Sequence, residues 1–114
     1  MKKAEHFHVF LGVKTSNLDL AKKVCEAFVG KSMQCWNGQS HGGDYCVAQN
    51  GGGEFDLRLN HHNDGSGWSW CLEDPVFPLV LSCWFADAAN ALPFMSRVKR
   101  FDLLEWKKGT ELIR

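Results

Sequence analysis

Histidines and carboxylates are the residues in this chain whose types and spacing could bind a metal ion. His6 and His8 lie two positions apart, so in a strand both side chains project from one face. Glu54 and His61 lie in a second extended stretch, and imidazole and carboxylate groups are common ligands of transition metals. If the two strands are neighbours, these four side chains form a candidate metal site, although no ligand-spacing motif accompanies them.

The thiols and the glycine-rich stretch match no catalytic motif. Cys71 lies in a predicted loop, but the residues around it do not resemble a nucleophile turn. The three glycines at 51–53 are followed by neither Lys-Ser nor Lys-Thr, so they predict a turn rather than a phosphate loop. We therefore predict a protein that is not an enzyme, with no catalytic residue and no cofactor.

The composition of the chain limits the kinds of partner that the protein can bind and the compartment in which we expect it. The chain has 114 residues, with 13 basic and 13 acidic side chains, and this balance argues against binding nucleic acid by phosphate neutralisation. The first six residues lack the apolar core of a signal peptide, and no run approaches the roughly 20 apolar residues of a membrane span. Five cysteines without a Cys-x-x-Cys pair are typical of reduced thiols. We expect a cytoplasmic protein that binds neither nucleic acid nor membrane.

The stretch from Asp44 to His61 is predicted to form the hairpin that organises the fold. The glycines at 51–53 supply the positive φ angles of a tight turn. After the turn, apolar and polar residues alternate, which indicates a strand with one face on a core and the other in water. The polar set is Glu54, Asp56, Arg58, Asn60 and His62.

The other segments complete an α+β domain over residues 1–114. Strands are predicted at 6–13, 33–36, 79–85 and 103–106, with a ragged edge at 111–114. One helix follows residue 17, and another begins between residues 87 and 90. The βα-βββ-βαβ order predicts a mixed or antiparallel sheet of about five to seven strands with two helices on one face, ferredoxin-like or related.

Residues 62–78 mix turn formers with large aromatic and acidic side chains. Trp68 and Trp70 could anchor a protein interface, since tryptophan is enriched at binding hot spots. Alternatively, they extend an edge strand and fold back onto the core. Acids near them would suit a basic partner, and the polar face of the hairpin could add contacts. The predicted contact residues are Asp64, Trp68, Trp70, Glu73, Asp74, Glu54, Asp56 and Arg58.

A compact α+β domain with aromatic and acidic loops resembles, in general character, the immunity proteins of bacterial contact-dependent growth inhibition systems. The resemblance implies a tight one-to-one complex that blocks the active site of a toxin. The protein partner would be a basic toxin domain such as a nuclease.

The first half also resembles one module of the vicinal oxygen chelate family, the glyoxalase-like proteins. The matching pieces are the strand at 8–10, the helix at 18–28, and the stretches 43–47 and 53–57. This resemblance implies a metal- or small-molecule-binding domain, as a dimer in which two modules complete one site. Its ligands would be His6, His8, Glu54 and His61. A structural subunit of a larger assembly is a third alternative.

Overall fold

A computed structural model describes residues 6–38, 43–63, 68–70, 76–106 and 111–113. His6, Gly38, Gly43 and the segments 61–63, 68–70 and 111–113 are described by their backbone alone. The main sheet contains β1 (His6–Val13), β2 (Gln34–Gly38), β3 (Gly43–Asn50), β4 (Gly53–Leu59), β7 (Leu79–Phe85), β8 (Leu104–Trp106) and β9 (Glu111–Ile113). The helices are α1 (Leu18–Val29), α2 (Ala88–Met95) and the short 3₁₀ helix η2 (Val98–Arg100).

The sheet has the order β2-β3-β4-β7-β1-β8, and β9 also pairs with β1. All its paired strands are antiparallel, so β1 and β2 run parallel with three strands between them. Without β3 and β4 the order would be β2-β7-β1-β8, which is the split βαβ arrangement of a ferredoxin-like domain. The predicted α+β class and element order are therefore confirmed, with an added hairpin widening the sheet.

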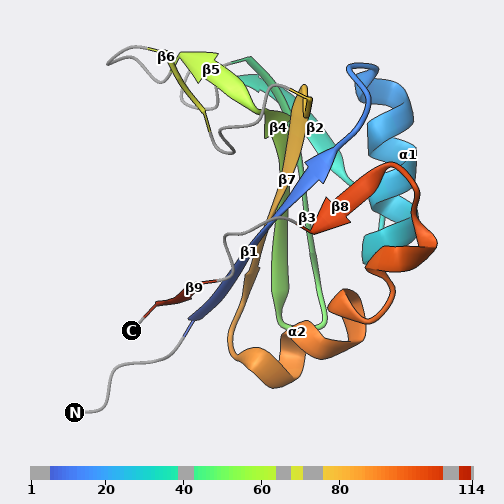
Figure 1. Cartoon of the computed structure of the whole chain (residues 1–114), viewed down its shortest axis with the longest axis vertical. Coiled ribbons are helices and arrows are strands. Elements are labelled where there is room, and N and C mark those ends of the chain that lie inside the picture. Colours follow the sequence, from blue (N-terminus) through green and yellow to red (C-terminus); the bar gives the residue numbers. More distant parts are fainter. Residues whose placement is uncertain (1–5, 39–42, 64–67, 71–75, 107–110, 114) are drawn as a thin grey trace.

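Both α-helices lie on the same side of the sheet (Figure 1). The side chain of Asn17 begins α1 by accepting a hydrogen bond from the Leu20 amide, and Gly30 ends it with a φ of 83°. The Asp87 side chain begins α2 in the same way, through the Asn90 amide. Among the described residues, no helix is long and apolar enough to cross a membrane.

The core fills the space between the helices and the sheet. Phe28 of α1 meets the ring of Phe55 edge-on, with 6.3 Å between centroids, and Phe94 of α2 lies 5.0 Å from Phe55. Alternate residues of β1 and β7 complete this layer, as the period of two predicts. Leu92 of α2 is 67% exposed, because Ala91 and Phe94 form the inward side of this helix.

The turn of the organising hairpin is confirmed. Gly51 and Gly52 have φ angles of 58° and 77°, and they join the paired residues Asn50 and Gly53. The second strand is shorter than predicted, because β4 ends at Leu59. Beyond it, Asn60 is fully buried, and its side-chain amide donates a hydrogen bond to the Phe77 carbonyl.

After Asn60 the chain forms a separate two-stranded sheet of β5 (His61–Asn63) and β6 (Trp68–Trp70). The backbone of His61 pairs with that of Trp70, and Asn63 pairs with Trp68. The segment carrying both tryptophans therefore pairs with β5 and does not extend the edge of the main sheet. Figure 1 shows this hairpin at the end of the sheet, on the side away from the helices.

The expectation that all cysteines are reduced is wrong. Cys35 and Cys46 are directly opposite each other on β2 and β3, and they form a disulfide. The thiols of Cys25 and Cys83 are free, as predicted, and both residues are buried. The disulfide could not be read from the sequence, because it depends on the register of two strands joined by a loop.

Candidate binding face

The face of the sheet opposite the helices carries the candidate site. Strand alternation places polar and aromatic side chains of five strands on this face. We call it the open face, because neither α-helix covers it (Figure 1). Its residues include Gln34, Trp36, Tyr45, Val47, Gln49, Glu54, Asp56, Arg58, Val80, Ser82, Trp84, His8 and Phe10.

A histidine, a serine and an indole form the centre of the open face. His8 Nε2 lies 2.7 Å from Ser82 Oγ, and the imidazole stacks on Trp84 with 3.7 Å between ring centroids. Both His8 and Ser82 are buried, whereas Trp84 is 37% exposed. Burial, with a smaller contribution from the positive charge of Arg58, lowers the pKa of His8 from 6.5 to about 4. His8 is therefore an uncharged support beneath the indole at neutral pH.

The two charged residues beside this centre compensate each other. Asp56 and Arg58 project from β4 on the same face and form an ion pair. Their side chains are only 18% and 24% exposed, so the pair is shielded from water. The Arg58 Nε atom is buried and has no hydrogen-bond partner among the described residues.

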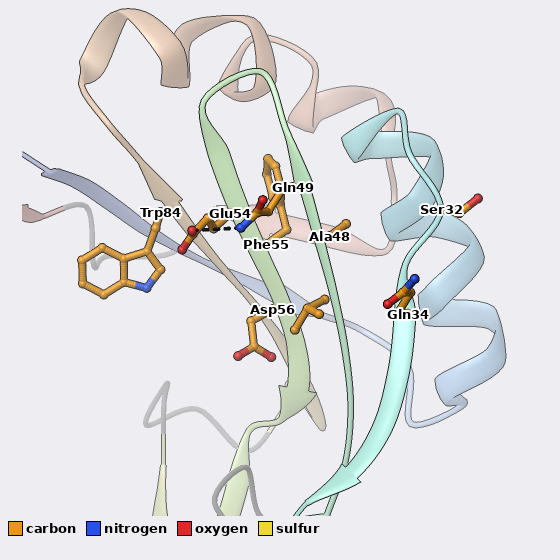
Figure 2. A pocket seen from close by; sticks show the side chains of 9 residues that line it. Ser32, Gln34, Ala48, Gln49, Glu54, Phe55, Asp56 and Trp84 are labelled. Atoms are coloured by element: carbon orange, nitrogen blue, oxygen red, sulfur yellow. Dashed lines mark hydrogen bonds between the residues drawn. The ribbon is translucent and has the colours of Figure 1, made fainter.

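A depression of about 590 Å³ lies next to Trp84 and extends over β4, β3 and the start of β2 (Figure 2). Its polar lining comes from Glu54 and Asp56, the amides of Gln34 and Gln49, and Ser32. The Gln49 amide donates a hydrogen bond of 3.1 Å to the Glu54 carboxylate. The depression is open, and its chemistry suits a polar or charged group reached from solvent.

An apolar cluster closes the other end of the open face. Phe77 and Val80 are fully buried and pack against Phe10. Phe77 lies directly over Gly12 of β1, where a Cβ atom would come within 2.4 Å of the phenyl ring. Gly12 is thus required by the close approach of the Phe77 ring.

The structure brings three of the predicted contact residues together. Glu54, Asp56 and Arg58 all lie on the open face, and the first two line the depression. Asp64, Glu73 and Asp74 lie outside the described residues, as does Cys71. Trp68 and Trp70 are placed only through the backbone of β6.

The four alternative metal ligands do not lie on neighbouring strands of one sheet. His8 and Glu54 are both paired with Trp84, so β7 separates them. His6 starts β1, and His61 belongs to β5 in the smaller sheet. Within the described part of the chain, no three His, Cys, Asp or Glu side chains are grouped closely enough to hold a metal ion.

Sequence reasoning missed Ser82, Trp84 and Gln49 as parts of the site. The stretch Leu79–Phe85 reads as a continuous apolar run, which predicts a strand covered on both faces. The sequence did contain one signal for them, because Ser82 and Trp84 alternate with the fully apolar Leu81, Cys83 and Phe85.

Comparison with known protein families finds no match to this chain, and comparison with curated proteins finds none either.

The lowered pKa of His8 predicts a pH-dependent stability. The unfolded state gains a proton near pH 6.5, but the folded state does so only near pH 4. The contribution of His8 to stability is therefore complete above about pH 6.5, and about 3 kcal/mol of it is lost between there and pH 4. Urea unfolding of the wild type and of His8→Gln at several pH values measures this loss, because only the wild type carries the His8 imidazole. Parallel pH profiles of the two proteins would show that His8 is not the cause.

Proposed function

We propose that this chain is a non-catalytic binding protein that neutralises a toxin, an immunity protein of a bacterial contact-dependent growth inhibition system. It forms a tight one-to-one complex that blocks the toxin active site. The observation that carries the proposal is the open face, where an exposed indole borders a depression lined by acidic and amide side chains.

The physical character of the open face favours a protein partner. Tryptophan and arginine dominate the energetics of protein interfaces, and Trp84 and Arg58 both project from this face. Trp36 is 48% exposed beside Tyr45 at the outer edge, so a second aromatic group lies on the same face. A rigid sheet presents these groups at little entropic cost, which favours tight binding.

The charge on the face favours a basic partner such as a nuclease domain. Asp56 is neutralised by Arg58, whereas Glu54 contributes a negative charge at the depression. Complementary charge accelerates association and excludes wrong partners. The acids at 64, 73 and 74 would add to this field.

The proposal includes a cytoplasmic location, where thiols are usually kept reduced. The Cys35–Cys46 bond does not conflict with binding there. Cys46 belongs to the core, on the helix side of the sheet, and the bond joins β2 and β3 away from the open face. Reduction would loosen an edge strand while leaving β4 and β7 paired.

Titration with a toxin domain tests the proposal. If a large secreted toxin is encoded immediately upstream of this chain, its toxic domain is the partner to use. We expect one-to-one binding, loss of toxin activity, and about 2 kcal/mol weaker binding for Trp84→Ala, because hot-spot aromatics carry effects of this size. For the double variant Trp68→Ala and Trp70→Ala, we expect binding of the toxin domain to weaken by at least about 2 kcal/mol.

Leu92→Ala is the matched control, because Leu92 is exposed on α2, on the helix side of the sheet. The affinity of this variant for the toxin domain should equal that of the wild type. The proposal fails if toxin activity persists at saturating concentrations, or if Leu92→Ala weakens binding as much as Trp84→Ala. Circular dichroism of each variant separates lost binding from unfolding.

A further inference from the structure

Glu54 and Trp84 form a cross-strand pair at the edge of the depression. They are directly opposite each other on β4 and β7, and Gln49 is opposite Glu54 on β3. Side chains in such positions have Cβ atoms about 5 Å apart. Figure 2 shows the Glu54 carboxylate between the Gln49 amide and the Trp84 indole.

Glu54 supplies a negative charge that no basic side chain in the described part of the chain neutralises. Its carboxylate accepts a hydrogen bond from Gln49 and has no ion pair with a described residue. Lys31 borders an adjoining hollow with Glu54, but the two are not within ion-pair distance. The other acid of the depression, Asp56, is already paired with Arg58.

Trp84 offers an aromatic surface next to this charge. One side of the indole stacks on the His8 ring at an interplanar angle of 18°, which fixes its orientation. The indole remains 37% exposed, and the same residue lines the depression. A fixed indole beside a carboxylate can attract a cation through its π-electrons and through the full charge at once.

We propose that the Glu54–Trp84 pair is a subsite for one guanidinium group, the side chain of an arginine of the protein partner. A planar guanidinium stacks on an indole and donates two parallel hydrogen bonds to a carboxylate. A lysine ammonium can make the ion pair but cannot stack or bind in this two-pronged way. Only the source of the arginine rests on the proposed function, and the subsite itself rests on the geometry of the open face.

Nuclear magnetic resonance titration with N-acetylarginine amide tests the subsite without the partner. The Trp84 indole N–H signal is identified by its absence in Trp84→Phe. We expect a saturable shift of this signal, with affinity about tenfold weaker for the uncharged isostere N-acetylcitrulline amide. N-acetyllysine amide should also bind more weakly than the arginine probe.

Glu54→Gln should lower the affinity for N-acetylarginine amide about tenfold, because the substitution removes the charge and keeps the size of the side chain. Glu105→Gln is the control, since Glu105 lies on β8 and pairs with Lys14. Equal affinity for the citrulline probe, or unchanged affinity in Glu54→Gln, would overturn the subsite.

The guanidinium subsite and the toxin-neutralising function can be disproved independently of each other. A toxin domain that binds and is inhibited while the arginine probe leaves Trp84 unshifted would exclude the subsite and keep the proposed function. A probe that binds through Glu54, in a chain that does not bind the toxin, would keep the subsite and exclude the function.

Discussion

Gly12→Val is expected to destabilise the fold by about 3 kcal/mol, at the upper end of overpacking substitutions. Any Cβ at this position would lie within 2.4 Å of the Phe77 ring, where neither side can yield easily. Gly12 pairs with Val80 on β7 and Glu105 on β8, so its backbone is held from both sides. Phe77 is fully buried over it. Urea unfolding monitored by tryptophan fluorescence measures the loss.

A double-mutant cycle identifies the cause of this destabilisation. Phe77→Ala alone should cost about 3 kcal/mol by leaving a cavity. In the Phe77→Ala background, Gly12→Val should cost much less, because the phenyl ring that it would strike is absent. Full additivity of the two losses would mean that Phe77 does not lie over Gly12.

Phe55→Ala is expected to cost about 4 kcal/mol, whereas Glu54→Ala should change stability by less than about 0.5 kcal/mol. The two residues are neighbours in β4 and project to opposite faces of the sheet. Phe55 is buried among Phe28, Phe85 and Phe94, and truncation would leave a cavity in this cluster. Glu54 is exposed, with one amide contact.

Chemical unfolding of both variants, with calorimetry as a second measurement, compares the two faces directly. The contrast tests whether β4 faces the main core only with its helix side. Similar losses in the two variants would mean that the opposite side of β4, at Glu54, is also part of the packed interior. A small loss in Phe55→Ala would contradict the aromatic cluster.

Local patterns were sufficient to predict most of the elements. The strand at 6–13 has the predicted bounds, because its alternation continues to the last residue. The turn at Gly51 and Gly52 follows from the need for positive φ angles, which glycine adopts without strain. Asn17 and Gly30 are cap residues whose positions fix both ends of α1.

Long-range pairing could not be predicted in the same way. Nothing local shows that β7 inserts between β4 and β1, because any apolar strand satisfies the pattern at that place. The Cys35–Cys46 bond depends on the register of β2 against β3. The end of β4 at Leu59 depends on Asn60 bonding to the distant Phe77 and Pro78 carbonyls.

The candidate site was predictable only where side chains alternate in type. Glu54, Asp56 and Arg58 stand out as a polar row in the second hairpin strand. Trp84 was hidden in an apolar run, and its place beside Glu54 needs the pairing of β4 with β7. The role of His8 as a support for Trp84 likewise needs the pairing of β1 with β7.

Hydroxyl-radical footprinting of the complex with the toxin domain tests most directly whether the open face is the binding surface. Trp84 and Leu92 are both solvent-exposed in the free protein, on opposite sides of the sheet. We predict that the partner protects Trp84 from oxidation and leaves Leu92 as reactive as before. Protection of Leu92 with unchanged oxidation of Trp84 would contradict the account.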